Sequence, residues 1–183
     1  MEIEIKVQIE DKETLLKELD SNGEALYKDF QKDSYYTPSH RNFIEASPIK
    51  EWLRLRDSNG KYSINYKNWA IEADGTSNYC DEHESIIASF EEMEKIFSAL
   101  NFKPLVVVEK SRSAWRYKEY EVSFDEVTDH GSFVEIEYKG ATLTDPKEIT
   151  DGMMKFLEQW NVGTIRRDFK GYPHLMLEKK NLL

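Results

Sequence analysis

Apolar and charged residues alternate one by one along much of this chain, which is the pattern of β-strands with one apolar and one polar face. The clearest example is Glu2-Ile3-Glu4-Ile5-Lys6-Val7, in which β-branched residues separate charged ones. Asn59-Gly60, between two alternating segments, predicts a tight hairpin turn. Further turns are expected near Ser113 and at His130-Gly131, and further strands over residues 27–37, 51–56, 61–67, 78–87, 105–112, 115–124 and 132–139.

Helical periodicity is present in three places. Asp11 is a suitable N-cap for a short helix that carries three leucines and ends at Gly23. Ser89 begins a capping box before apolar residues at helical spacing, and a third helix is predicted from Asp145-Pro146 to about Trp160. Residues 165–183 are ambiguous and fit a short strand followed by a short helix. Strands in hairpin order with few helices indicate an α+β, mainly β chain, and favour an antiparallel barrel or sandwich.

The composition limits the kind of protein this can be. A chain of 183 residues, 39% hydrophobic and 13% aromatic, is expected to fold as one compact domain over residues 1–183. Its net charge of −10 argues against sequence-independent binding of nucleic acid and against anionic membranes. No apolar run approaches the roughly 18 residues that cross a bilayer. Cys80 is the single cysteine and cannot form an internal disulfide, so we expect a cytoplasmic protein.

The charged strand faces carry side chains of both signs. Alternation alone favours faces turned to solvent, by about two to one, because sheets with one wet side show the same pattern. These faces, however, contain few of the Ser, Thr, Asn and Gln that usually dilute a solvated sheet, and helices are available to cover the apolar faces. Both observations favour a barrel that is apolar outside and charged inside. Its candidate lining residues are Glu2, Glu4, Glu82, Glu84, Asp125, Glu135 and Glu137 against Lys6, Arg54, Arg56, Lys67, Lys110 and Arg112.

A barrel lined with charge is costly unless a ligand uses the charge, because removing ions from water is expensive even when they pair. Two divalent cations would make this lining positive overall, and a triphosphate would then nearly neutralise it. Carboxylates bind hard ions such as Mg²⁺ or Mn²⁺, whereas Arg and Lys bind phosphate oxygens. We therefore expect one or two such ions and a polyphosphate ligand, rather than a sugar or an apolar molecule.

The order of these residues resembles the CYTH superfamily, the triphosphate tunnel metalloenzymes. Glu2-x-Glu4-x-Lys6 is similar to the ExExK signature of that family. The likeness extends to about Tyr172 and is greatest for the CyaB-type branch, the class IV adenylyl cyclases and their archaeal relatives. It also rests on an ordered series of segments: Arg54-x-Arg56, Lys67 after a tyrosine, Cys80-Asp81-Glu82-His83-Glu84, residues 108–112, Phe124-Asp125-Glu126-Val127 and residues 131–137.

This resemblance implies an eight-stranded, antiparallel, closed β-barrel with helices on the outside, which binds ATP or another triphosphate with Mg²⁺ or Mn²⁺. Relatives of the CyaB type also suggest a homodimer. The chain departs from the family pattern at Asn68-Trp69 and Gly171-Tyr172, near the expected tunnel mouth, so substrate choice is open. By position, the resemblance implies metal-side carboxylates at Glu2, Glu4, Glu135 and Glu137, further acidic lining at Glu82, Glu84 and Asp125, and a phosphate clamp of Lys6, Arg54, Arg56, Lys67, Lys110 and Arg112, with Lys6, Arg54 and Lys110 as catalytic residues.

Other sites are weaker. Cys80 is a poor candidate nucleophile because acidic neighbours oppose thiolate formation. The four histidines lack the spacing of a zinc site, and the glycines form neither a P-loop nor a dinucleotide fingerprint. Trp69, Trp115 and Tyr172 are able to stack on an adenine, but packing in the core or at the rim is at least about twice as common for such residues.

Three functions fit the expected site. The first is an adenylate cyclase, in which the ribose 3′-hydroxyl displaces pyrophosphate. The second is a hydrolase that uses the same site and water to cleave inorganic triphosphate, thiamine triphosphate or a nucleotide. The third is a non-catalytic triphosphate-binding module. The CyaB-like motifs favour the cyclase.

Overall fold

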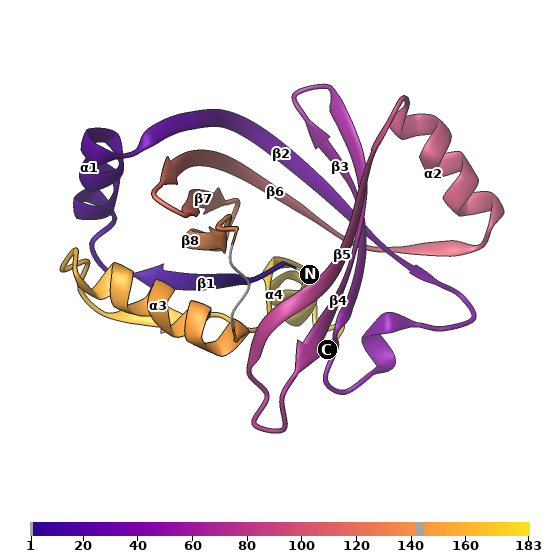
Figure 1. Cartoon of the computed structure of the whole chain (residues 1–183). Coiled ribbons are helices and arrows are strands. Elements are labelled where there is room, and N and C mark those ends of the chain that lie inside the picture. The colour runs from indigo at the N-terminus through magenta and orange to yellow at the C-terminus, as the bar shows by residue number, and fades with distance from the viewer. Residues whose placement is uncertain (1, 142–144) are drawn as a thin grey trace.

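The computed structural model describes residues 2–141 and 145–183, and within them one antiparallel sheet dominates (Figure 1). The sheet order is β5-β4-β3-β2-β6-β7-β8-β1-β9, so most neighbours are joined by hairpins. Its strands are β1 (Glu4–Ile9), β2 (Glu24–Pro38), β3 (Glu51–Ser58), β4 (Lys61–Ile71), β5 (Ser77–Ile87), β6 (Phe102–Tyr117), β7 (Tyr120–Val127), β8 (Gly131–Tyr138) and β9 (Ile165–Arg167).

Four α-helices and one short 3₁₀ helix accompany these strands in the described residues. Asp11 and Ser89 cap the first two α-helices as predicted, through their side chains and the amides of Thr14 and Glu92. None of these helices is long and apolar enough to cross a membrane. The helices are α1 (Lys12–Asn22), the 3₁₀ helix η1 (Phe43–Glu45), α2 (Phe90–Ala99), α3 (Pro146–Glu158) and α4 (Tyr172–Lys179).

The sheet curls into an open barrel whose two sides touch at one place. The edge strand β5 meets the segment before β1 in an isolated bridge, where Glu2 and Cys80 exchange two backbone hydrogen bonds of 2.9 and 3.0 Å. The mainly β antiparallel barrel is therefore confirmed, but it has nine strands and is not fully closed. Closure stops at this bridge because β1 continues away from β5 and pairs with β9 over Val7–Ile9.

The helices α1, α2 and α3 lie on the outside of the barrel (Figure 1), where they pack against apolar side chains of the strands. Ile3, Ile5 and Val7 of the first segment pack with leucines of α1 and with α3. On the other side of the molecule, Leu53 and Leu55 pack with Phe97 of α2. The alternation of the sequence thus correctly predicts the apolar face of residues 3–7 and of β3.

The fourth helix differs, because it packs on the inner face of the sheet at one end of the barrel. Leu177 and Tyr172 of α4 lie against Val108 and Phe133, which belong to inward-facing rows of β6 and β8. The expectation that all helices lie outside is therefore corrected for α4. The expected turn near Ser113 is also wrong, since β6 runs unbroken through it and the chain reverses only between Tyr117 and Tyr120.

Candidate active site

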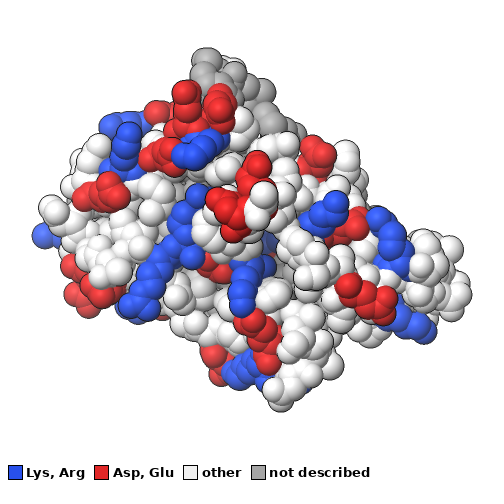
Figure 2. Space-filling model, turned by 90° about the horizontal axis from the view of Figure 1, so that it is seen from below, with Lys and Arg blue, Asp and Glu red and all other residues white. Residues whose placement is uncertain are grey.

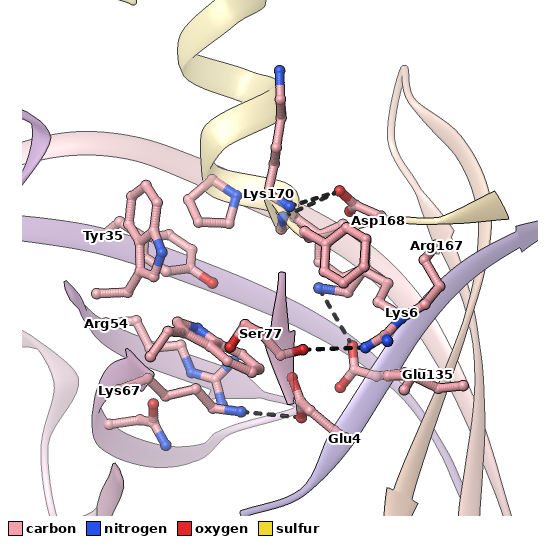
Figure 3. Close-up of a pocket in the computed structure, with 18 of the residues that line it drawn as sticks. Glu4, Lys6, Tyr35, Arg54, Lys67, Ser77, Glu135, Arg167, Asp168 and Lys170 are labelled. Carbon is pink, nitrogen blue, oxygen red and sulfur yellow. Dashed lines mark hydrogen bonds and ion pairs between the residues drawn. The ribbon is translucent and has the colours of Figure 1, made fainter. Parts of the chain in front are cut away.

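The inner face of the barrel and the start of α4 enclose a cavity lined by charged and aromatic side chains (Figure 3). Six different strands, β1, β3, β4, β6, β8 and β9, supply charged residues to its lining, so the site exists only when the sheet is curled. Six of the predicted site residues meet here: Glu4, Lys6, Arg54, Lys67, Lys110 and Glu135. From below, acidic and basic side chains are interspersed over the surface and do not form a patch of one sign (Figure 2).

Strand register places opposite charges side by side across the inner face. Lys6 of β1 lies opposite Glu135 of β8, with Nζ and Oε2 3.7 Å apart. Lys67 of β4 likewise lies opposite Glu82 of β5. Because residues directly opposite each other in antiparallel strands have neighbouring Cβ atoms, the register alone brings these charges together.

Asp125 is the centre of a buried cluster of donors. Its side chain is fully buried and accepts hydrogen bonds from Lys110 (2.8 Å), from Arg112 through two nitrogens (2.7 and 2.6 Å) and from the Tyr172 hydroxyl (2.7 Å). Burial raises the pKa of Asp125, but Arg112 and Lys110 outweigh this and lower it to about 2. Burial together with Arg112 lowers the pKa of Lys110 to about 7. We call Asp125, Lys110, Arg112 and Tyr172 the Asp125 cluster.

Asp33 of β2 holds two further cations of the predicted clamp. Its carboxylate accepts two hydrogen bonds from Arg56, at 2.6 and 2.7 Å, and one from Arg54, at 3.3 Å. Burial opposes ionisation of Asp33, but these two guanidinium groups hold its pKa well below the usual range. The Arg54 Nε atom is buried without a hydrogen-bond partner among the described residues. Arg54 therefore keeps one side-chain donor without a partner in the described part of the chain.

Three carboxylates surround one ammonium group where β1 and β5 meet. Lys67 Nζ donates to Glu2, lies 3.2 Å from Glu4 Oε2 and lies 3.7 Å from Glu82 Oε1. Burial, with Glu4 and Glu82 nearby, raises the pKa of Glu2 to about 9. We call Glu2, Glu4, Glu82 and Lys67 the carboxylate cluster. Its acids outnumber its bases, in contrast to the clusters around Asp125 and Asp33.

Two of the predicted acids, Glu137 and Glu84, are not members of these clusters. Glu137 faces inward opposite Glu4 on β1, is hydrogen-bonded by Lys139, and has a pKa raised by burial with Glu4 adding to the shift. Glu84 is exposed and accepts one hydrogen bond, of 3.1 Å, from Ser63. Glu137 thus lies close enough to the carboxylate cluster to join it, whereas Glu84 belongs to the surface.

The donor chemistry of the carboxylate cluster suits a hard divalent cation. Mg²⁺ and Mn²⁺ prefer carboxylate oxygens, and an added positive charge would relieve the crowding that raises the pKa of Glu2. Within residues 2–141 and 145–183, no group of three or more potential ligands is arranged to hold an ion. The ammonium group of Lys67 occupies the centre of the acids, so ion binding requires this side chain to move.

Sequence reasoning missed three polar residues of the site. Asp33 and Asn65 are almost fully buried on inward rows of β2 and β4, and Asn65 donates to Glu82. For Tyr172 the sequence predicts core or rim packing, or stacking on an adenine, but not its polar contact: the hydroxyl donates to Asp125, and the ring centre lies 3.9 Å from Lys6 Nζ. The alternation Asp29-x-Gln31-x-Asp33 was a signal that could have revealed Asp33. Trp115, in contrast, packs in the outer core away from the cavity.

An antiparallel barrel whose inner face carries paired acids and bases is the architecture of a triphosphate tunnel. A family model agrees: the CYTH domain matches residues 1–172, and the chain belongs to this family. Members of the family bind triphosphates and are adenylate cyclases or triphosphatases that are generally metal-dependent.

Individual relatives cover nearly the whole chain. A Methanocaldococcus jannaschii protein named "Putative adenylate cyclase" is 32% identical over 176 residues, which are 96% of this chain and 98% of that protein. The PH1819 protein of Pyrococcus horikoshii has a similar structure, with a TM-score of 0.81 and 25% identity over 98% of this chain and 99% of its own. A Hippeastrum protein described as a "putative adenylyl cyclase" with "a dominant triphophatase activity" has a TM-score of 0.65 and 17% identity, over 99% and 96%.

Proposed function

We propose that this chain is a metal-dependent adenylate cyclase that converts ATP to cyclic AMP and pyrophosphate. The observation that carries the proposal is the division of the inner face into fixed cation clusters and a carboxylate cluster with excess negative charge. The first suits phosphate oxygens and the second suits the cations that accompany a triphosphate. The 32% identity to the Methanocaldococcus jannaschii protein named "Putative adenylate cyclase" supports this activity over hydrolysis.

Lys6 and Arg54 are the cations best placed to bind phosphate. The Nζ atom of Lys6 lies 3.7 Å from Glu135 Oε2, which is longer than a hydrogen bond, and it lies over the ring of Tyr172. The ammonium protons of Lys6 are therefore not committed to short hydrogen bonds. Arg54 keeps its unpartnered Nε beside the cavity. Both side chains can bind phosphate oxygens without breaking a strong existing contact, and neutralise charge that gathers on departing pyrophosphate.

Arg56, Lys110 and Arg112 are held by their carboxylates and act as a fixed positive field. Arg112 bridges Asp125 and Glu135, with 2.9 Å to the latter, while Arg56 is bound to Asp33 through two hydrogen bonds. Such fixed charges need no reorganisation during the reaction. We assign Asp125 to this structural task, because four donors already occupy its carboxylate.

Glu2, Glu4 and Glu82, with Glu137 beside them, are the residues that we propose hold Mg²⁺ or Mn²⁺. When bound, the metal would polarise phosphate oxygens and favour ionisation of the attacking hydroxyl. Lys67 would then move from the acids toward phosphate, because its present partners would be neutralised by the metal.

A product assay tests the proposal. The chain is incubated with ATP and Mg²⁺ or Mn²⁺, and the products are separated by chromatography. We expect cyclic AMP and pyrophosphate in equal amounts, and loss of at least about 100-fold of this activity in Lys6→Ala and Arg54→Ala, because each removes a charge from the phosphate clamp. The surface variant Lys32→Ala, at a side chain that is half exposed, is the matched control and keeps wild-type rates. ADP and phosphate as the sole products would contradict the cyclase.

Hydrolysis of a triphosphate is the second candidate. The charged residues contact phosphates and metal ions, so they serve equally when water replaces the ribose hydroxyl as nucleophile. The activity named for the Hippeastrum protein, whose fold is similar, motivates the test. Release of phosphate from inorganic triphosphate faster than formation of cyclic AMP from ATP would favour it. Binding without any turnover would instead leave the third candidate, a triphosphate-binding module.

A further inference from the structure

Lys6 differs from the other cations of the predicted clamp in what holds its charge. Each of the others donates a hydrogen bond of 3.3 Å or less to a carboxylate: Arg54 and Arg56 to Asp33, Lys110 and Arg112 to Asp125, and Lys67 to Glu2 and Glu4. Lys6 Nζ, in contrast, lies 3.7 Å from its acidic neighbour, Glu135 Oε2 (Figure 3). Of the cations in this set, Lys6 is therefore the least tied to an acid.

An aromatic ring lies against the ammonium group of Lys6. The centre of the Tyr172 ring is 3.9 Å from Nζ. A ring attracts a cation through its electron-rich face, but it neither neutralises the charge nor takes up the protons as a carboxylate does. An ammonium group held in this way keeps both its charge and its donors for an anionic ligand.

The Tyr172 ring is itself fixed in position. Its hydroxyl donates to Asp125 at 2.7 Å, the ring of Phe133 meets it edge-on at 5.0 Å between centres, and only 3% of the residue is exposed. Lys110 Nζ also lies 4.8 Å from the ring centre. The Asp125 cluster thus sets the position of the ring, and the ring extends this fixed geometry to Lys6 on β1.

The residue before the ring leaves space beside Lys6. Gly171 has a φ of +79°, a conformation that favours glycine. A Cβ atom at this position would lie 3.8 Å from Lys6 Nζ, so a polar side chain here would reach the ammonium group. With glycine at this position, α4 approaches Lys6 through the ring of its first residue, Tyr172.

We infer that Tyr172 is a positioning residue, whose ring holds the Lys6 ammonium away from Glu135 and so keeps it available to the triphosphate. Without the ring, Lys6 would close the gap of 3.7 Å and form a hydrogen-bonded ion pair with Glu135, because opposite charges attract strongly where water is scarce. A phosphate would then have to break this pair before it could bind. The inference rests on the proposed triphosphate binding and adds a residue that acts through Lys6.

Calorimetry with the full chain and Mg²⁺ tests the inference through binding and not turnover. The probe is the bis-methylene analogue of inorganic triphosphate, whose bridges resist hydrolysis. Tyr172→Phe keeps the ring and Tyr172→Leu removes it, while both lose the hydrogen bond to Asp125, so the matched pair isolates the ring. We expect Tyr172→Phe to bind within about twofold of the wild type and Tyr172→Leu about 10-fold more weakly, as for loss of a desolvated contact between cation and ring.

A double-mutant cycle separates positioning from a merely structural role. In a Lys6→Met chain, which has no ammonium group at this place, Tyr172→Leu and Tyr172→Phe should bind the probe within about twofold of each other. If Tyr172 served only to pack the cavity, its loss would weaken binding equally with and without Lys6. Thermal unfolding checks that each variant folds.

Nuclear magnetic resonance of the Lys6 side chain provides a readout that needs no ligand. The ε-methylene protons of Lys6 are assigned by their disappearance in Lys6→Met. We expect the ring to shift them upfield of exposed lysines in the wild type and in Tyr172→Phe, and we expect the shift to be lost in Tyr172→Leu.

Each outcome decides the inference. Equal affinities of Tyr172→Phe and Tyr172→Leu, or an undiminished difference between them in the Lys6→Met chain, would overturn the positioning role and leave triphosphate binding intact. Unshifted ε-methylene protons in the wild type would overturn it as well, even if Tyr172→Leu fails to fold. Failure of the wild-type chain to bind the probe would overturn the proposed function, and the Lys6 resonance would still decide whether the ring holds Lys6.

Discussion

The Asp125 cluster and the carboxylate cluster occupy the same inner face but differ in electrical balance. Around Asp125, one acid receives four hydrogen bonds from two cations and a hydroxyl. Around Lys67, three acids compete for one ammonium group, and the pKa of Glu2 rises as a result of burial and this crowding. The first cluster is balanced within the protein, whereas the second keeps an excess of negative charge. We propose that the first is a structural charge network and that an additional cation completes the second.

The largest expected effect comes from Asp125→Asn. Two buried cations would lose their shared counter-charge, and breaking a buried pair in this way costs about 3–5 kcal/mol of unfolding free energy. Urea unfolding measures the loss, and Glu126→Gln, the exposed neighbour on the same strand, is the control and stays within about 0.5 kcal/mol. A stable Asp125→Asn variant would show that the cluster is not the structural network described above.

The second effect is a pH dependence due to Lys110. Because its folded-state pKa lies near 7 and its unfolded value near 10.5, the unfolded chain binds more protons between these values. Stability therefore rises with pH across this window, by up to about 1.4 kcal/mol per pH unit, and falls as pH decreases toward 7. Unfolding of the wild type and of Lys110→Met at pH 7, 8 and 9 isolates this contribution. Parallel curves for the two proteins would refute it.

The third prediction is a small increase in stability, in contrast to the loss expected for Asp125→Asn. Glu2→Gln removes one of three crowded carboxylates, so the metal-free protein is expected to gain up to about 1 kcal/mol, or about 2–4 °C in Tm. The same change should weaken Mg²⁺ binding at least about 10-fold, because a ligand charge is lost. Thermal unfolding in EDTA and calorimetry with Mg²⁺ measure the two. Loss of stability without loss of Mg²⁺ binding would mean that the cluster is structural.

The smallest effect is expected for Glu84→Gln, which changes an exposed acid bound only to Ser63 in the described structure. Both the unfolding free energy and the Mg²⁺ affinity should remain nearly constant, the former within about 0.5 kcal/mol. A clear fall in Mg²⁺ affinity would extend the carboxylate cluster along β5.

Local patterning predicted much of this molecule because strand faces follow from single-residue alternation. It separated Glu4 and Lys6 from Ile3 and Ile5 on opposite faces. The shortage of Ser, Thr, Asn and Gln on the charged faces, with helices available to cover the apolar ones, then favoured the charged face inside, as the structure shows. It could not place α4, because an apolar stripe on a short helix does not say which side of a sheet it covers. The incomplete closure was equally hidden, since it depends on the meeting of Glu2 with Cys80, which are far apart in sequence.

The pairing of donors and acceptors was harder to predict than their location. Lys110 and Arg112 were expected to bind phosphate, but the structure shows them bound to Asp125, and Asp33 holds Arg56 in the same way. Such assignments depend on register between strands and on side-chain reach, which alternation does not encode. The pairing of Asp125 and Asp33 with these cations is therefore visible only in the three-dimensional structure.

The isolated bridge between Glu2 and Cys80 links the closure of the barrel to the carboxylate cluster. The backbone of Glu2 joins the two edges of the barrel, while its side chain belongs to the carboxylate cluster that we propose binds a cation. A change that breaks the Glu2–Cys80 bridge also displaces the Glu2 carboxylate. An ion bound to this carboxylate would, conversely, help to keep the bridge formed. Amide hydrogen exchange at Cys80 therefore reports whether ion binding stabilises the bridge between the two edges of the barrel.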